Sequence, residues 1–187
     1  MVVWVAIVAI AGERVAEGCQ IVTQPTQADG VTPMVATCRW PEVDPARLTA
    51  KVSDFAGYDT LLPHAIVADR VVRVEGDRSL VWQHQTAPVI ADREVLLWMR
   101  RSTEGACTVV SWTAATEVAW DVAEGRVRAP RNDGSWRVCA VPEGGVEAVH
   151  TIAYDPGGQV PGFVVRAAQG GGLDKVLASA RAVGAKP

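Results

Sequence analysis

With 187 residues and 49% hydrophobic content, the chain is long enough for one globular domain with a substantial buried core. The formal net charge is −3 and the charges are scattered, which argues against nucleic acid as a partner, because nucleic-acid-binding proteins carry a basic surface that displaces counterions. No apolar run approaches the roughly 20 residues of a transmembrane helix, so the abundant alanine and valine indicate an apolar interior surface.

Residues 1–11 (MVVWVAIVAIA) form a short apolar segment. Its length suits the hydrophobic region of an export signal, and Ala9-Ile10-Ala11 before Gly12 resembles a signal-peptidase site, although no basic residue precedes it. The alternative is that this segment is the first strand or helix of the domain. We therefore expect a single domain over residues 12–187. The protein is periplasmic or secreted if the segment is an export signal, and cytoplasmic otherwise.

Two strands are predicted over residues 17–24 and 32–40, on either side of a polar loop. A stretch with two prolines then ends the sheet. Asp44 can cap a helix over residues 46–54, with a proline at its first position. A second short helix is predicted over residues 58–62, after a glycine that breaks the first.

The middle of the chain reads as a series of antiparallel strands. β-rich runs predict strands over residues 66–74, 79–86, 93–101 and 106–120, with glycine-containing turns between them. Two further strands flank the Gly-rich turn at residues 142–145.

A long C-terminal helix is predicted from about Val160 and Pro161, because proline suits the first helical turn. Its apolar stripe continues to Val183. Three glycines, Gly170 to Gly172, interrupt this pattern and cost about 3 kcal/mol relative to alanine in a helix interior. We therefore expect the helix to kink or break there.

The four cysteines, Cys19, Cys38, Cys107 and Cys139, show neither a C-x-x-C motif nor a zinc-like spacing. The sequence favours four small buried thiols. The alternative is that Cys19 and Cys38 face each other across a hairpin and form a disulfide, which needs an oxidising compartment.

Two segments carry a resemblance to a known family. The first runs from Gly134-Ser135-Trp136 to the turn Asp155-Pro156-Gly157-Gly158 about twenty residues later, and on into the apolar helix. The second, ADREVLL at residues 91–97, is similar to a Ser-x-Arg-Asp segment with Glu94 in place of aspartate. Both resemble the START domain, bacterial type, of the helix-grip superfamily of lipid and hydrophobic-ligand carriers. The similarity extends weakly over most of the chain.

The resemblance implies an α+β helix-grip fold, in which a curved antiparallel sheet wraps around a long C-terminal helix, with short helices after the second strand. It implies a lipid or other hydrophobic small molecule, bound in a cavity between the sheet and that helix for transport, transfer or sensing. Transient contact with a membrane is compatible with this function. No cofactor or metal is expected.

Alternation along the strands adds candidate cavity residues, because a face with large apolar groups and a few polar ones is typical of a ligand pocket. The histidines are also consistent with half-buried residues bonded to the backbone, and the tryptophans with core packing. Arg93 with Glu94 would form either a buried charge pair at a ligand's head or a rim salt bridge of little energetic value. The candidate residues are Trp82, His84, Arg93, Trp98, Trp136, His150, Ile152, Tyr154, Val160, Phe163, Val164 and Ala167.

The sequence gives little support for catalysis. It contains no H-x-x-x-H pair, no G-x-S-x-G elbow and no phosphate-binding glycine loop after a strand. Two alternatives to a carrier stay open. Some helix-grip relatives are polyketide cyclases, for which Arg93, His150 and Tyr154 would be the residues to test. A helix-grip module with a filled interior would instead serve as an interaction domain with an exposed apolar patch.

Overall fold

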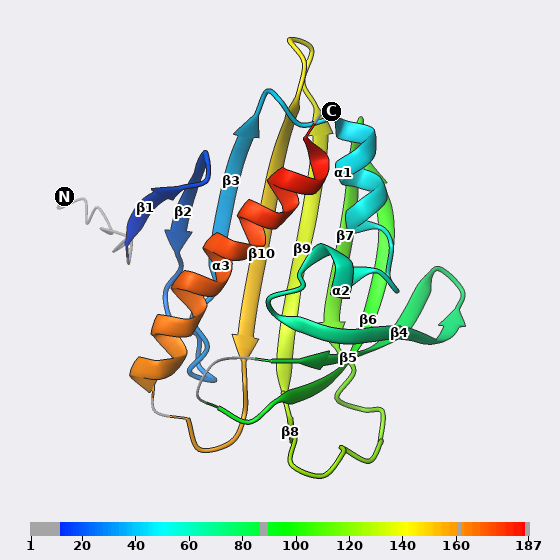
Figure 1. Cartoon of the computed structure of the whole chain (residues 1–187), viewed down its shortest axis with the longest axis vertical. Coiled ribbons are helices and arrows are strands. Elements are labelled where there is room, and N and C mark those ends of the chain that lie inside the picture. Colours follow the sequence, from blue (N-terminus) through cyan, green and yellow to red (C-terminus); the bar gives the residue numbers. More distant parts are fainter. Residues whose placement is uncertain (1–11, 87–89, 161, 186–187) are drawn as a thin grey trace, which may run out of the picture.

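The computed structural model describes residues 12–86, 90–160 and 162–185, and for residues 162–170 it describes the backbone. One ten-stranded sheet and a long helix make up most of the fold (Figure 1). The strands are β1 (Glu13–Ala16), β2 (Cys19–Thr23), β3 (Met34–Trp40), β4 (Ile66–Glu75), β5 (Arg78–Gln85), β6 (Arg93–Glu104), β7 (Cys107–Ala114), β8 (Val127–Arg128), β9 (Arg131–Ala140) and β10 (Val146–Asp155). The helices are α1 (Pro45–Val52), α2 (Tyr58–Leu61) and α3 (Gly162–Gly184).

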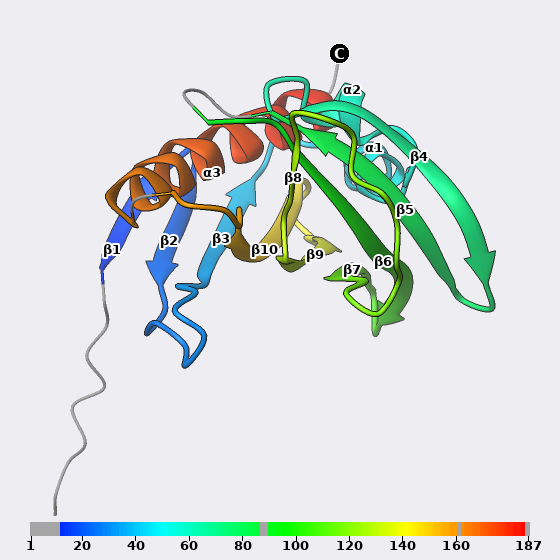
Figure 2. The same ribbon diagram turned by 90° about the horizontal axis from the view of Figure 1, so that it is seen from below.

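The strand order is β1-β2-β3-β10-β9-β7-β6-β5-β4, and all these neighbours pair antiparallel. The short β8 pairs parallel with the start of β6. The sheet curves, so that β4 and β5 run across the direction of β3 and β10 in Figure 1. The three helices cover its concave face, which we call the inner face (Figures 1 and 2). This is the predicted α+β helix-grip fold.

One N-terminal strand was not predicted. The predicted strand at residues 17–24 begins at what is a tight turn, where Glu17 and Gly18 have φ of 52° and 73°. Positive φ at both central residues is the geometry of a two-residue hairpin turn. The chain before it, β1, therefore folds back along β2, and the short helices follow the third strand.

The capping signals placed α1 correctly. Asp44 Oδ1 accepts a hydrogen bond from the backbone N–H of Arg47 at 2.9 Å, and Pro45 occupies the first turn. Leu48 and Val52 face the core and are fully buried. The backbone N–H of Asp44 also donates to the carbonyl of Gly184, which joins the start of α1 to the end of α3.

The helix α3 is continuous through Gly170 to Gly172, so the predicted break does not occur. Leu173, Leu177 and Ala180 pack into the core on its inner side. Tertiary packing of this face compensates for the low helix propensity of the glycines. Pro161, the predicted start, lies outside the described residues, as do residues 1–11. Among the described residues, no helix is long and apolar enough to cross a membrane.

The predicted strand over residues 106–120 is also too long. β7 ends at Ala114, where the backbone N–H bonds to the Asp133 side chain instead of a strand partner. The following loop, residues 115–126, crosses the outer face of β5 and β6. There Ala115 joins Leu80, Leu96 and Trp98 in a second, smaller core. This part of the sheet is thus covered on both faces.

All four cysteines form disulfides, Cys19 with Cys38 and Cys107 with Cys139, so the favoured prediction of four thiols is wrong. Each pair is directly opposite in the register of adjacent antiparallel strands, where Cβ atoms lie close together.

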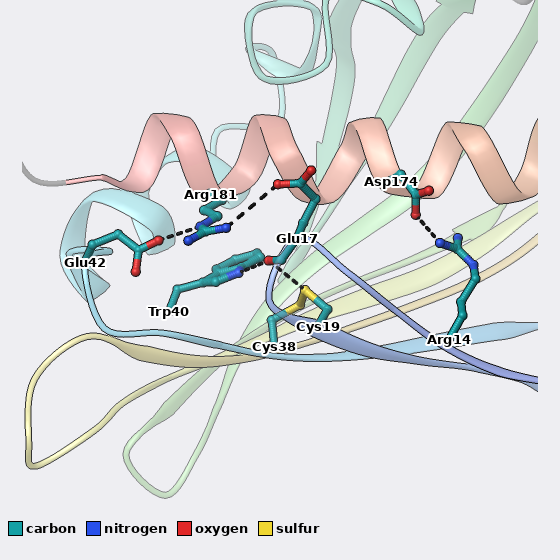
Figure 3. The surroundings of a disulfide bond; sticks show 8 residues. All are labelled: Arg14, Glu17, Cys19, Cys38, Trp40, Glu42, Asp174 and Arg181. Atoms are coloured by element: carbon teal, nitrogen blue, oxygen red, sulfur yellow. Dashed lines mark hydrogen bonds and ion pairs between the residues drawn. A yellow bond between two sulfur atoms is a disulfide. The ribbon is translucent and has the colours of Figure 1, made fainter.

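Figure 3 shows the first disulfide beneath α3. Beside it, Arg181 of α3 forms ion pairs with Glu17 and Glu42, and Asp174 forms one with Arg14 of β1 at 2.6 Å. These contacts join α3 to the N-terminal strands.

Candidate functional site

A cavity of about 430 Å³ lies between the inner face of the sheet and α3. Strands β5, β6, β7, β9 and β10 provide most of one wall, and α2, the loop after it and α3 provide the other. Its apolar lining includes Met34, Leu97, Met99, Trp112 and Ile152. No aspartate or glutamate is among the described residues that line it.

His150 is a buried, neutral residue of this wall. Its Nδ1 lies 3.1 Å from the carbonyl oxygen of Ser135, and its ring stacks on Trp136 with centroids 4.1 Å apart. Burial lowers the pKa of His150 to about 4, although the hydrogen bond to the Ser135 carbonyl opposes this shift. At neutral pH the ring therefore donates from Nδ1, and Nε2 remains an acceptor.

A directed chain of hydrogen bonds links three further polar side chains of the wall. Tyr154 donates to Gln85 Oε1 at 3.2 Å, and Gln85 Nε2 donates to Gln83 Oε1 at 2.9 Å. Burial raises the pKa of Tyr154 to about 12, so its hydroxyl stays protonated at neutral pH. These groups are all uncharged and can orient a ligand's neutral polar groups.

Trp112 of β7 places its indole beside Gly134, its cross-strand partner on β9. Its Nε1 donates to Asn132 Oδ1 at 3.0 Å, and both residues are buried. The ring passes over Gly134, where a Cβ atom would lie 2.6 Å from the indole and 2.4 Å from the carbonyl oxygen of Thr151. Only glycine fits under this ring, which gives the glycine of the Gly-Ser-Trp segment a packing role.

The rim of the cavity lies where α3 meets the loop between α2 and β4. Gly171, Gly172 and Lys175 of α3 line it, together with His64 of the loop. The Nε2 of His64 is buried and has no hydrogen-bond partner among the described residues. Burial and the nearby Lys175 ammonium lower the pKa of His64. A Cβ atom at either glycine would have no neighbour within 4 Å.

Five of the residues predicted from sequence line this cavity: Trp136, His150, Ile152, Tyr154 and Val160. Their binding of a ligand remains a prediction. Phe163, Val164 and Ala167 fall in the part of α3 whose side chains are not described.

Trp82, His84 and Trp98 do not line the cavity, so their predicted placement is wrong. Side chains alternate along a strand, and on β5 the inward set consists of Val81, Gln83 and Gln85. Trp82 and Trp98 pack with the second core on the outer face. His84 bonds to Asp92 at 2.7 Å.

A second hollow, of about 590 Å³, lies on the outer face between β4–β6 and the loop at residues 115–126. Within it, Glu94 is almost fully buried and accepts hydrogen bonds from Trp82 Nε1 at 3.1 Å and from Arg126 at 2.7 Å. Burial alone would raise the pKa of Glu94, but these donors outweigh it and lower the pKa. Arg70 lies over the Trp82 ring at 4.1 Å.

Arg93 and Glu94 do not form the predicted charge pair, because successive side chains on a strand point to opposite faces. The buried Arg93 guanidinium instead donates to the carbonyls of Ala91, Pro156 and Gly157, at 3.1 Å for Pro156 and 3.3 Å for Gly157. It therefore fastens the turn between β10 and α3 to the start of β6, and it is not among the cavity-lining residues.

Sequence reasoning missed the polar cavity residues Gln83, Gln85 and Asn132 and the rim residues His64 and Lys175. Assigning the odd-numbered residues of β5 to the inner face of the sheet would have identified the two glutamines. The rim residues come from a loop and a helix whose approach to each other depends on tertiary structure, so no local signal marks them.

No protein-family model matches the sequence, and no curated protein is significantly similar to it. Solved structures are similar in fold. A STAR-related lipid transfer protein from Xanthomonas axonopodis is 16% identical, with a TM-score of 0.77 over 90% of this chain and 94% of that one. Human StAR-related lipid transfer protein 5 is 12% identical, with a TM-score of 0.81 over 93% of this chain and 86% of that one.

An aromatase/cyclase, Zhui from Streptomyces sp. R1128, is 12% identical, with a TM-score of 0.54 over 80% of this chain and 93% of that one. At such low identity these similarities define the fold alone. The chain has the START, or helix-grip, fold that the two sequence segments predicted.

Proposed function

We propose that this protein binds a lipid or similar hydrophobic small molecule in the cavity between the sheet and α3, as a carrier, transfer protein or sensor. The observation that carries the proposal is the cavity of about 430 Å³ with its largely apolar lining and uncharged polar groups. The volume falls within the ~300–1,000 Å³ of small-molecule sites. The similar fold of two proteins named for lipid transfer supports it.

Binding would be driven by burial of the ligand's apolar body against Leu97, Met99, Trp136 and Ile152. Such burial contributes roughly 25 cal/mol per Å² of apolar surface before ordering costs are subtracted. His150 and the Tyr154–Gln85–Gln83 chain would then select orientation, because an unmatched ligand polar group loses its hydrogen bonds to water on entering the cavity.

The proposal includes no chemical step. A general base works best with a pKa near the operating pH, and His150, with a pKa of about 4, is a weak base at neutral pH. Arg93, the cationic candidate for a cyclase, donates its hydrogen bonds to the backbone carbonyls of Pro156 and Gly157 and is not itself among the residues that line the cavity.

We also propose that the protein works in an oxidising compartment, outside the cytoplasm. Two disulfides among four cysteines support this location, because cytosolic proteins rarely keep structural disulfides. Transient contact with a membrane, as the ligand's donor or acceptor, belongs to the same proposal.

Native mass spectrometry of the purified protein, followed by solvent extraction, tests the proposal. Wild-type protein should carry a hydrophobic small molecule. Ile152→Trp should lose it, since Ile152 lines the cavity. Val149→Trp, on the opposite face of the same strand, is the matched control and should retain it.

Circular dichroism establishes that each variant is folded. Ligand retained by folded Ile152→Trp would place the binding site elsewhere. If wild-type protein neither carries nor takes up any lipid, the interaction-module alternative is favoured.

A further inference from the structure

The described lining of the cavity carries one positive charge and no negative charge. Lys175, at the rim, is its one permanently charged residue among the described lining residues, and no carboxylate lines the cavity. Lys175 is exposed and forms no ion pair with any residue of the described ranges 12–86, 90–160 and 162–185. A ligand's anionic group would therefore meet a cation at this rim, and a cationic group would meet only repulsion.

His64 provides a second polar group at the same place. Its Nε2 is buried without a hydrogen-bond partner in the described part of the chain, and a buried polar atom in this state calls for a partner from outside the protein. A neutral imidazole with its proton on Nε2 donates to an oxyanion. Lys175 and His64 both line this cavity, and the Lys175 ammonium lies near enough to influence the titration of His64, so both groups are available to a ligand's anionic head.

The volume limits the apolar part of the ligand. A cavity of about 430 Å³ lies in the lower half of the ~300–1,000 Å³ typical of small-molecule sites. This size favours a ligand with one hydrocarbon chain of medium length over a lipid with two such chains.

We propose that the cargo is a single-chain amphiphile with a carboxylate head, the head at Lys175 and His64 and the chain directed inward toward Leu97 and Met99. This inference rests on the proposed function and narrows it. Lys175 supplies the charge and His64 a hydrogen bond. The absence of carboxylates from the described lining removes any competing partner for the lysine.

The test compares three probes that share one chain and differ in their heads: tetradecanoate, tetradecanol and tetradecyltrimethylammonium. Binding is measured by titration calorimetry, below the micelle concentration of the two ionic probes and below the solubility limit of the alcohol. Wild-type protein should bind tetradecanoate about tenfold or more tightly than the alcohol, a difference of about 1.4 kcal/mol, and the ammonium compound most weakly. Raising the salt concentration should reduce the preference, because the rim is exposed to solvent.

Lys175→Met should weaken binding of tetradecanoate by about tenfold and leave binding of tetradecanol unchanged. Lys51→Met is the matched control, because Lys51 is an exposed lysine of α1 outside the cavity. It should change neither.

If the alcohol binds wild-type protein as tightly as the carboxylate, or if Lys175→Met leaves the preference intact, the carboxylate inference is overturned while the proposed function stands. If no probe binds and no lipid is extracted from the protein, the proposed function itself fails.

Discussion

The imidazole of His150 stacks on the indole of Trp136, with centroids 4.1 Å apart, at the wall of the cavity. The ring is held there by the carbonyl of Ser135 and has no nearby carboxylate partner among the hydrogen bonds and ion pairs of the described residues. Protonation would place an unpaired cation between aromatic rings. Burial of the ring without a carboxylate partner therefore favours the neutral imidazole.

Lowering the pH should reduce the free energy of unfolding, because protonation of His150 is less favourable in the folded state than in the unfolded state. The pKa of His150 falls from 6.5 in the unfolded chain to about 4 in the folded one. Between these values the unfolded state binds more protons, so stability is complete above pH 6.5 and falls as pH drops toward 4. The loss amounts to up to about 3 kcal/mol.

Urea unfolding of wild type and His150→Phe at pH 7 and pH 4.5 measures this contribution. Phenylalanine keeps the stacking and does not titrate. A wild-type loss no greater than that of the variant would contradict the assignment of a buried neutral His150.

Two glycines of α3 should respond oppositely to alanine. At Gly172 a Cβ atom would have no neighbour within 4 Å, so Gly172→Ala should raise the free energy of unfolding by up to about 1 kcal/mol through helix propensity. At Gly184 it would lie 2.6 Å from Val43 Cγ1 and 3.3 Å from Leu48 Cβ. Gly184→Ala should therefore destabilise by about 1–3 kcal/mol.

Thermal unfolding of the two variants checks the contrast. A higher melting temperature for Gly184→Ala than for Gly172→Ala would show that the described packing of α3 on α1 is wrong.

The strands β10 and β5 show when the sequence could predict which side chains face the cavity. On β10, the predicted inward residues His150, Ile152 and Tyr154 do face the cavity. The opposite face of that strand carries mostly polar or half-exposed side chains, so alternation distinguishes the two faces.

On β5 the same reasoning failed because both faces are covered. The loop at residues 115–126 buries Leu80 and packs against Trp82 on the outer face, while the inner face presents Gln83 and Gln85 to the cavity. On β5 the apolar residues Leu80 and Trp82 therefore lie on the outer face, and two polar residues lie on the inner face. The fold itself was predictable, because turns, caps and the two family-like segments are local in sequence.

Removing the charge of Glu94 should loosen the loop on the outer face without affecting ligand binding. Glu94→Gln weakens the charge-assisted hydrogen bonds from Trp82 and Arg126, and should cost about 2 kcal/mol of unfolding free energy. Glu75→Gln, in exposed ion pairs with Arg73 and Arg78, is the matched control and should cost less than about 0.5 kcal/mol.

Chemical unfolding and lipid uptake are measured on both variants. Equal stabilities would mean that the buried carboxylate does not fasten this loop. Lost uptake in folded Glu94→Gln would indicate that the outer hollow takes part in binding.

Thiol titration should find no free thiol in the native protein and four after unfolding with reductant. Replacing Cys107 and Cys139 together by serine should lower the free energy of unfolding by about 4 kcal/mol, the value that loop-closure entropy gives for their separation of 32 residues. Mass spectrometry after alkylation without reductant gives the decisive count. Alkylation of a cysteine in freshly purified native protein would contradict the cross-link to which that cysteine belongs.

The strand order places one disulfide on each side of β10: Cys19–Cys38 joins β2 to β3, and Cys107–Cys139 joins β9 to β7. β4, β5 and β6 have no such bond. On the β9 side of β10, local unfolding of the sheet should therefore begin at the β4 edge, and amide hydrogens there should exchange with solvent earlier than those of β9 and β10. Ile66, Gln83 and Gln85 line the cavity from β4 and β5. Local unfolding of these two strands would therefore open the cavity at the wall that carries its glutamines.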